Sequence, residues 1–330
     1  MTRVTPRTAP RPALSRTRAT LAVPAALALA LALAACSQTT TPDDDAPTST
    51  APSASGSPAA SGATDSPASP GTPGSTDEAT AGEPLVLLAV GDSLTTGFAS
   101  CVTVIGCQAV SWAVGTDPEV DSIGTRLGEA GYAVTTVDAA VEGAQMARGV
   151  ELVDAAFAEP DAPAADDVDV VTVLLGANDV CEDTTASMTS AADYGAALGA
   201  LLDHVASIAP DAGVVVASIP HVTSVWDVAS DDPAAVQVWE EGLCATVLSG
   251  DDAARAAAED RLAELQAVAV TTCAEHPGCR TDDGAVAAVP VTTAWLSTFD
   301  HFHPSVLGQA ALAEAVWPAV ESALPTPAAG

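Results

Sequence analysis

Continuous apolar runs alternate with longer amphipathic stretches over most of the chain. The run Leu85–Val90 ends at Gly91, which is typical of a strand buried on both faces of a parallel sheet. Less purely apolar runs predict four more strands, at Ala133–Val137, Val168–Leu175, Gly213–Ile219 and Ala285–Val291. Helical stretches between them predict helices at Ser122–Glu129, Gln145–Phe157, Ala191–Ile208, Ala253–Val270 and Ser305–Ser322. This alternation predicts an α/β fold, a three-layer α/β/α sandwich around a central, mostly parallel sheet.

The first 35 residues have the order of charge and hydropathy that marks a secretory signal. Arginines without acidic partners precede an apolar run at Leu21–Ala35. The run is shorter than the roughly 20 apolar residues that a membrane-spanning helix needs, and it contains Pro24. We therefore expect residues 1–35 to be a cleaved signal peptide.

The signal ends in Leu33-Ala34-Ala35-Cys36, which resembles the bacterial lipobox. Cys36 is then the expected lipidation site and the membrane contact, although an ordinary signal peptide followed by an incidental cysteine is the alternative. Residues 36–83 are almost entirely Ser, Thr, Pro, Ala, Gly and Asp, so they cannot bury enough apolar surface to fold. This composition predicts a disordered tether. We expect it to connect the lipid anchor, at the outer face of the cytoplasmic membrane, to a single domain of residues 84–330.

Charge excludes several classes of partner. The chain has 10 basic and 43 acidic residues, a formal net charge of −33, and no lysine. Nucleic-acid binding depends on basic residues that neutralise phosphates, so it is not expected. A Walker A phosphate loop is excluded because it requires lysine. We expect a monomer with a solvated acidic surface and an acyl ester as its partner.

Seven cysteines are present, and six of them remain for the domain once Cys36 is set aside. An even number of cysteines in an exported domain indicates disulfides. The expected pairs are Cys101 with Cys107, Cys181 with Cys244, and Cys273 with Cys279. Metal binding is the competing use, but C-x-x-C spacing is absent, so no metal is predicted.

Four short motifs carry residues suited to chemistry. Gly91-Asp92-Ser93-Leu94 follows the first predicted strand, Gly143 follows the second, and Gly176-Ala177-Asn178-Asp179 follows the third. Asp300-His301-Phe302-His303-Pro304 precedes the last helix. Because ligands of open α/β sheets bind beyond the carboxyl ends of the strands, these motifs are expected to meet at one edge.

The motifs resemble those of the SGNH, or GDSL, hydrolases, whose name records Ser, Gly, Asn and His from four separated blocks. The matching positions are Ser93, Gly143, Asn178 and His303, and the resemblance extends from Leu85 to the final helix. The cysteines, with Ser111-Trp112 and Ser218-Ile219-Pro220, are similar to those of exported actinobacterial esterases and lipases. The resemblance implies a flavodoxin-like sandwich.

The same resemblance implies a role for each residue. Ser93 would be the nucleophile, His303 its general base, and Asp300 the carboxylate that orients the imidazole. The N–H groups of Ser93 and Gly143 and the amide of Asn178 would form the oxyanion hole. Asp92 and Asp179 are expected to brace the loops, and His301, adjacent to Asp300, to point elsewhere. No cofactor is implied.

These roles predict a carboxylic ester hydrolase that works through an acyl-enzyme. Short-chain esters, lipid esters and O-acetylated carbohydrate all remain candidate substrates. The alternatives are an acyltransferase that uses the same residues on cell-envelope glycans, and an inert surface binding protein. An ordinary α/β-hydrolase is disfavoured because the chain contains no G-x-S-x-G. Trp112 is expected either to shape the substrate pocket or to lie in the core.

Overall fold

The computed structural model describes residues 82–101 and 106–324. The expected signal peptide, Cys36 and nearly all of the expected tether lie outside these residues. None of the helices within the described ranges is long and apolar enough to cross a membrane.

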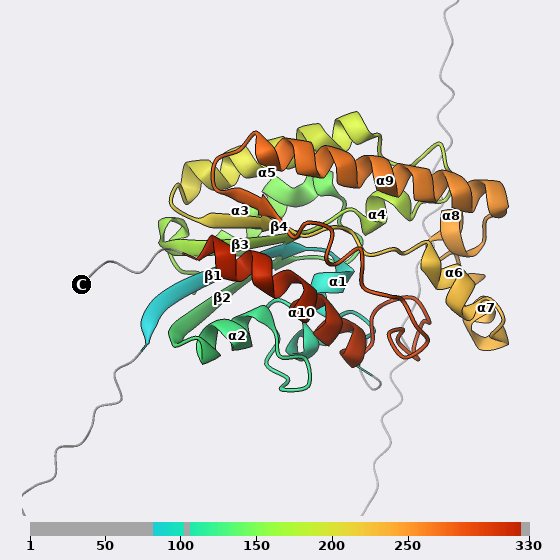
Figure 1. Cartoon of the computed structure of the whole chain (residues 1–330), viewed down its shortest axis with the longest axis horizontal. Helices are drawn as coiled ribbons and strands as arrows, with labels where there is room; N and C mark the ends of the chain where they lie inside the picture. Colours follow the sequence, from blue (N-terminus) through green and yellow to red (C-terminus); the bar gives the residue numbers. More distant parts are fainter. Residues whose placement is uncertain (1–81, 102–105, 325–330) are drawn as a thin grey trace, which may run out of the picture. The chain divides into compact units, whose positions relative to one another are not determined.

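Five strands form one parallel sheet in the order β2-β1-β3-β4-β5 (Figure 1). Their bounds are β1 Glu83–Gly91, β2 Tyr132–Ala140, β3 Val168–Leu174, β4 Gly213–Val216 and β5 Cys279–Thr281. β1 and β3 lie side by side in the middle of the sheet, paired from Leu87 with Val170 to Gly91 with Leu174. The predicted α/β sandwich is confirmed, and the sheet is wholly parallel over the described residues.

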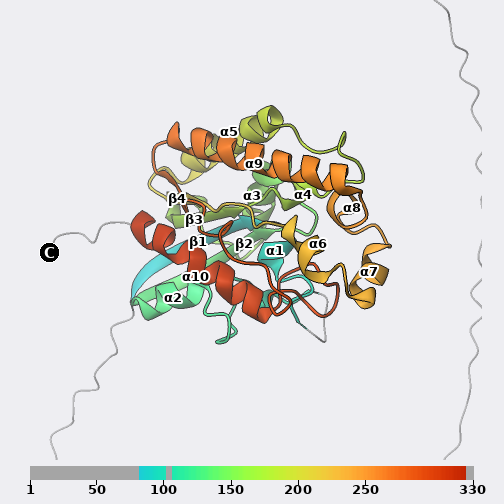
Figure 2. The same ribbon diagram turned by 45° about the vertical axis from the view of Figure 1, so that its right-hand side comes forward.

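Helices cover both faces of the sheet. α2 (Ile123–Glu129) and α10 (Val306–Ala323) lie on one face, whereas α3 (Gly149–Phe157), α5 (Ala191–Ile208) and α9 (Asp252–Ala274) lie on the other (Figures 1 and 2). A side chain caps the N-terminus of four of these helices: Ser122, Ser190, Asp251 and Ser305. Such oxygens satisfy N–H groups that have no partner within the helix, so each helix begins close to its predicted start. Short 3₁₀ turns occur at Gln108–Val110, Met146–Arg148 and Ala165–Asp167.

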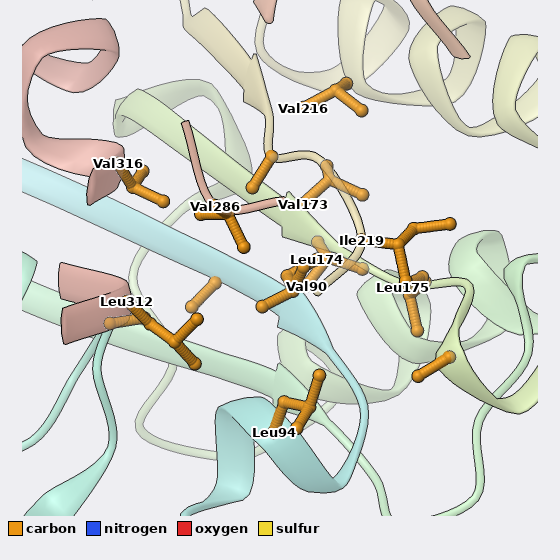
Figure 3. Packing of buried hydrophobic residues seen from close by; sticks show 14 of the residues in the cluster. Val90, Leu94, Val173, Leu174, Leu175, Val216, Ile219, Val286, Leu312 and Val316 are labelled. Carbon is orange, nitrogen blue, oxygen red and sulfur yellow. The ribbon is translucent and has the colours of Figure 1, made fainter. Parts of the chain in front are cut away.

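The core lies between the central strands and the covering helices. Figure 3 shows Val90 and Val173 of the sheet near Leu312 and Val316 of α10, and these side chains are buried. Val286 packs into the same cluster from a loop. This close packing fixes the strand ends from which the site residues emerge.

One predicted strand is wrong. Residues 285–288 form turns and 289–291 are irregular, and the fifth strand is instead the short segment β5 just before them. The run is apolar because Val286 is fully buried, but its backbone N–H is bonded to the Asp282 carboxylate at 2.8 Å and not to a neighbouring strand. A short buried apolar run cannot be identified as a strand by periodicity alone.

Short helices at the carboxyl ends of the strands were not predicted. α1 (Ser93–Thr96) follows β1, and α4 (Ala177–Val180) follows β3. After β4 come α6 (Ser224–Ala229), α7 (Pro233–Trp239) and α8 (Ala245–Leu248). Both views place α6–α8 at the same end of the sheet as α1 (Figures 1 and 2). This segment, residues 224–248, is called the α6–α8 segment below.

The three predicted disulfides are confirmed: Cys101–Cys107, Cys181–Cys244 and Cys273–Cys279. Cys273–Cys279 joins the end of α9 to β5. Cys181–Cys244 links residues 63 positions apart and attaches the start of α8 to the loop after α4. It therefore holds the α6–α8 segment against the carboxyl edge of the sheet.

Candidate active site

Ser93 lies at the turn from β1 into α1. Asp92 caps this helix by accepting a hydrogen bond from the Leu94 N–H at 2.9 Å, and the helix ends at Gly97 in the left-handed conformation. Position 91 requires glycine because the Thr95 side chain packs closely against its Cα: a Cβ there would lie 2.1 Å from Thr95 Oγ1. The turn directs the Ser93 side chain to the carboxyl edge of the sheet, where it is 7% exposed.

Ser93, His303 and Asp300 form one series of hydrogen bonds. Ser93 Oγ lies 2.8 Å from His303 Nε2, and His303 Nδ1 lies 2.5 Å from Asp300 Oδ2. With Asp300 ionised, Nδ1 carries the proton and Nε2 is the acceptor for the serine hydroxyl. The imidazole is therefore in the tautomer that can take the proton of Ser93.

Local backbone bonds hold the Asp300 carboxylate. Its Oδ1 accepts the N–H groups of Phe302 and His303, both at 3.0 Å. Burial alone would raise the pKa of Asp300. The hydrogen bond from His303, the charge of His303, and the hydrogen bonds from the two backbone N–H groups together outweigh burial, so the pKa is lowered below its ordinary value. Asp300 thus stays ionised at any pH at which the imidazole can act as a base.

Two aromatic rings enclose the imidazole. The ring centroids of Phe98 and Phe302 lie 4.9 and 5.0 Å from that of His303, both in edge-to-face geometry. Together with the 5% exposure of His303, this packing restricts the imidazole to one orientation. His301 adopts a positive φ of 55° and points away, as expected, with its Nδ1 4.0 Å from Asp232, the residue that caps α7.

The expected oxyanion donors lie on the same edge. Gly143 has a φ of 72°, which favours glycine, and no hydrogen bond between described residues uses its N–H or that of Ser93. Asn178 Nδ2 donates to Ala144 O at 3.0 Å and to Asp92 Oδ2 at 3.2 Å. The amide is held at the site, and donation to a substrate oxygen requires that one of these bonds opens.

Two buried carboxylates brace the site, as expected. Asp92 contacts Asn178, and Asp179 Oδ2 accepts the Met146 N–H at 3.0 Å. Burial raises the pKa of Asp92 to about 7, and repulsion from Asp179 adds to the rise, although the bond from Leu94 opposes it. Burial likewise raises the pKa of Asp179, whose Oδ1 has no partner among the described residues.

Asp92 gives the stability of the fold a specific pH dependence. The pKa of Asp92 is higher in the folded chain than in an unfolded one. Its contribution to the free energy of unfolding is therefore fully present below pH 3.8, the ordinary pKa, and is lost as the pH rises through about 7. We expect Asp92→Asn, which does not titrate, to show a smaller fall in Tm between pH 5 and pH 8.5 than the unmodified chain. The measurement is thermal unfolding at both pH values, with exposed Asp161→Asn as the control. An equal fall in all three proteins would contradict this expectation.

Two spaces open onto Ser93. The first, the apolar pocket, is lined by Leu94, Ala177, Pro220, His221, Val222, Val225, Val291 and Trp295. The second, the open groove, is lined by Phe98, Glu142, Gly143, Gly242, Leu243, Cys244 and His303. Ser93, Asn178, Cys181 and Phe302 line both.

Sequence reasoning missed a residue that supports the Asp300 loop from outside. Trp239 of α7 is buried, and its Nε1–H donates to the backbone carbonyl of Asp300 at 3.2 Å. Trp226 packs against Trp239 with ring centroids 6.0 Å apart, and the Arg255 guanidinium lies 4.1 Å from the Trp226 ring. These residues lie 45 or more positions before Asp300, so no local pattern could have revealed the contact.

Three other residues take their places only in the folded chain. Gln309 of α10 accepts the Trp112 N–H and donates to Leu94 O, both at 3.0 Å, which fixes α1 against the last helix. Trp112 is a core residue: it is fully buried, and its Nε1–H bonds to Thr95. His221, in the loop before α6, lines the apolar pocket.

A serine, a histidine and a carboxylate in hydrogen-bond series at the carboxyl edge of a parallel sheet are typical of a serine hydrolase built on an α/β/α sandwich. The chain belongs to the GDSL-like lipase/acylhydrolase family, whose model matches residues 89–311. It is an ester hydrolase.

Solved structures of similar fold are distant in sequence. A lipase/acylhydrolase from Enterococcus faecalis is 17% identical, with a TM-score of 0.48, over 74% of this chain and 100% of the other. An extracellular lipase from Streptomyces rimosus is 18% identical, with a TM-score of 0.43, over 72% and 99%. Phospholipase A1 from Streptomyces albidoflavus is 19% identical, with a TM-score of 0.43, over 73% and 99%. The search of curated proteins gives no match.

Proposed function

We propose that the chain is a serine esterase that hydrolyses carboxylic acyl esters through an acyl-enzyme on Ser93. The observation that carries this proposal is the uninterrupted series from Ser93 Oγ through His303 to Asp300, with separations of 2.8 and 2.5 Å. A hydroxyl is a weak nucleophile until a base accepts its proton during attack, and His303 Nε2 is within reach to do so.

The oxyanion of the tetrahedral intermediate would be stabilised by the N–H groups of Ser93 and Gly143 and by the amide of Asn178. The two backbone donors have no protein acceptor among the described residues, and all three groups are neutral. They therefore stabilise the negatively charged oxygen by hydrogen bonds and do not transfer a proton to it. Asp92 keeps the Asn178 amide at the edge of the open groove.

Hydrolysis of p-nitrophenyl esters from acetate to palmitate tests this proposal. We expect release of p-nitrophenol from at least one ester, with loss of activity as acid protonates the imidazole. A parallel reaction with an added alcohol separates hydrolysis from acyl transfer, because a transferase would form a new ester. The absence of both products with every ester would overturn the proposal in favour of an inert binding protein.

A further inference from the structure

The apolar pocket and the open groove both reach Ser93, and only the open groove is lined by the base. His303 lines the open groove and is not among the residues of the apolar pocket. The leaving alcohol must receive its proton from His303 Nε2, so its oxygen has to lie on the groove side. The apolar pocket, which also reaches Ser93 but is not lined by His303, is then the space left for the other substituent of the carbonyl carbon, the acyl chain.

From this arrangement, and resting on the proposed esterase function, we propose that the apolar pocket binds the acyl group and restricts the enzyme to acetyl and other very short acyl esters of bulky alcohols. The pocket walls are chemically suited to a hydrocarbon group, since Val222, Val225 and Trp295 are apolar and buried. The groove carries Glu142 and the backbone of Gly242 and is suited to a polar alcohol.

The size of the pocket sets the limit on chain length. Its cavity volume is about 20 Å³, whereas that of the open groove is about 300 Å³. A volume of 10–15 Å³ on this measure holds about one water molecule, so the pocket accepts a methyl or ethyl group and not an extended chain. Val225 is 1% exposed and belongs to the packed α6–α8 segment, so a longer chain would have to displace close-packed side chains.

The groove indicates the character of the alcohol. Its larger volume admits a substituent the size of a sugar ring or larger, and the Glu142 carboxylate lines it. The formal net charge of −33 repels anionic substrates as well. The preferred substrates are therefore short-acyl esters of large neutral or cationic alcohols. Lipids with long acyl chains are disfavoured as substrates.

With the acyl group in the apolar pocket and the alcohol in the open groove, both half-reactions can proceed through His303. Ser93 Oγ bonds to the carbonyl carbon while its proton passes to His303 Nε2, and the bond from that carbon to the alcohol oxygen then breaks as the oxygen takes the proton. The alcohol leaves by the open groove. Water entering there attacks the acyl-enzyme and gives a proton to Nε2, and Ser93 Oγ takes that proton as the short carboxylic acid is released.

Measurement of kcat/KM for p-nitrophenyl acetate, butyrate, hexanoate and palmitate tests this assignment. We expect the unmodified enzyme to prefer acetate over hexanoate by about 1,000-fold, since hexanoate carries about three methylenes more than the pocket accepts and each costs about tenfold. Val225→Ala enlarges the pocket and should reduce this ratio about tenfold by accelerating hexanoate hydrolysis. Val291→Ala, at a half-buried loop position, should act in the same direction even if Val225→Ala fails to fold.

Leu243→Ala is the matched control, because Leu243 lines only the open groove. It should leave the ratio of acetate to hexanoate unchanged. A preference of the unmodified enzyme for hexanoate or palmitate would overturn the assignment, as would an unchanged ratio in both pocket variants, while the esterase function would stand. If no ester is hydrolysed, the proposed function itself fails, and the acyl assignment fails with it.

Discussion

Replacement of Ser93 by alanine is expected to reduce kcat for ester hydrolysis by about 10⁴-fold or more, because loss of a triad nucleophile removes the acyl-enzyme route. The variant keeps the oxyanion donors and both substrate spaces, so KM should change little. Its fold should also persist, since Ser93 Oγ has one hydrogen-bond partner in the site, His303 Nε2. The measurement is a steady-state assay on p-nitrophenyl acetate, with thermal unfolding to establish that the variant is folded.

Ser322→Ala is a suitable control for this change. Ser322 is exposed near the end of α10, where its hydroxyl donates to the Ala319 carbonyl of the same helix, and its loss should leave activity unchanged. A phosphonate ester that traps activated serines should add once to the unmodified chain, on the peptide that contains Ser93. Activity of Ser93→Ala within tenfold of the unmodified enzyme would show that another group attacks the ester.

Asp300→Asn is expected to lower kcat by about 10⁴-fold through the wrong imidazole tautomer. The asparagine Oδ1 would still accept the N–H groups of Phe302 and His303, which now bond to Asp300 Oδ1. Its NH₂ group would then face His303 Nδ1, and that nitrogen would have to become an acceptor. The imidazole proton would move to Nε2, which could no longer accept the proton of Ser93.

The pH profile separates this effect from a simple loss of stability. Because the pKa of Asp300 is lowered, the carboxylate of the unmodified enzyme stays ionised through the acid limb of the profile. Protonation of Asp300 therefore does not contribute to that limb, and Asp300→Asn should lower the plateau of the rate. Asp232→Asn is the control, since Asp232 faces His301 outside the series and asparagine can also cap α7. Equal losses in the two variants would contradict the assigned role of Asp300.

The residues proposed to be catalytic could be predicted because each belongs to a short motif that is visible in the sequence. Asp300 reaches His303 across a turn closed by its own carboxylate, so the spacing Asp-x-x-His indicates the pair. Ser93 and Asn178 each follow a strand whose apolar run is visible in the sequence, and parallel strands bring their carboxyl ends to one edge. This rule predicted that Ser93 and His303 lie close together, although 210 positions separate them in the sequence.

The last strand shows where the pattern failed. β5 consists of Cys279–Thr281, three residues that include a charged arginine, and it is placed by pairing with β4 and by the Cys273–Cys279 disulfide. The apolar run that follows is buried by tertiary packing around Val286 and not by a sheet. Hydrophobicity reports burial, and burial alone does not distinguish a strand from a turn.

The sequence by itself determined the α/β alternation, the disulfide pairs, and the residues expected to carry out ester hydrolysis, because each depends on local periodicity, spacing or a motif. Only the tertiary structure decided that Trp239 supports the Asp300 loop, that Trp112 lies in the core, and that Ser93 lines both a narrow pocket and a wide groove. The physical reason is that a cavity is the volume that side chains from distant segments leave unfilled. Val225 and Val291 narrow the apolar pocket from segments that no local pattern relates to Ser93.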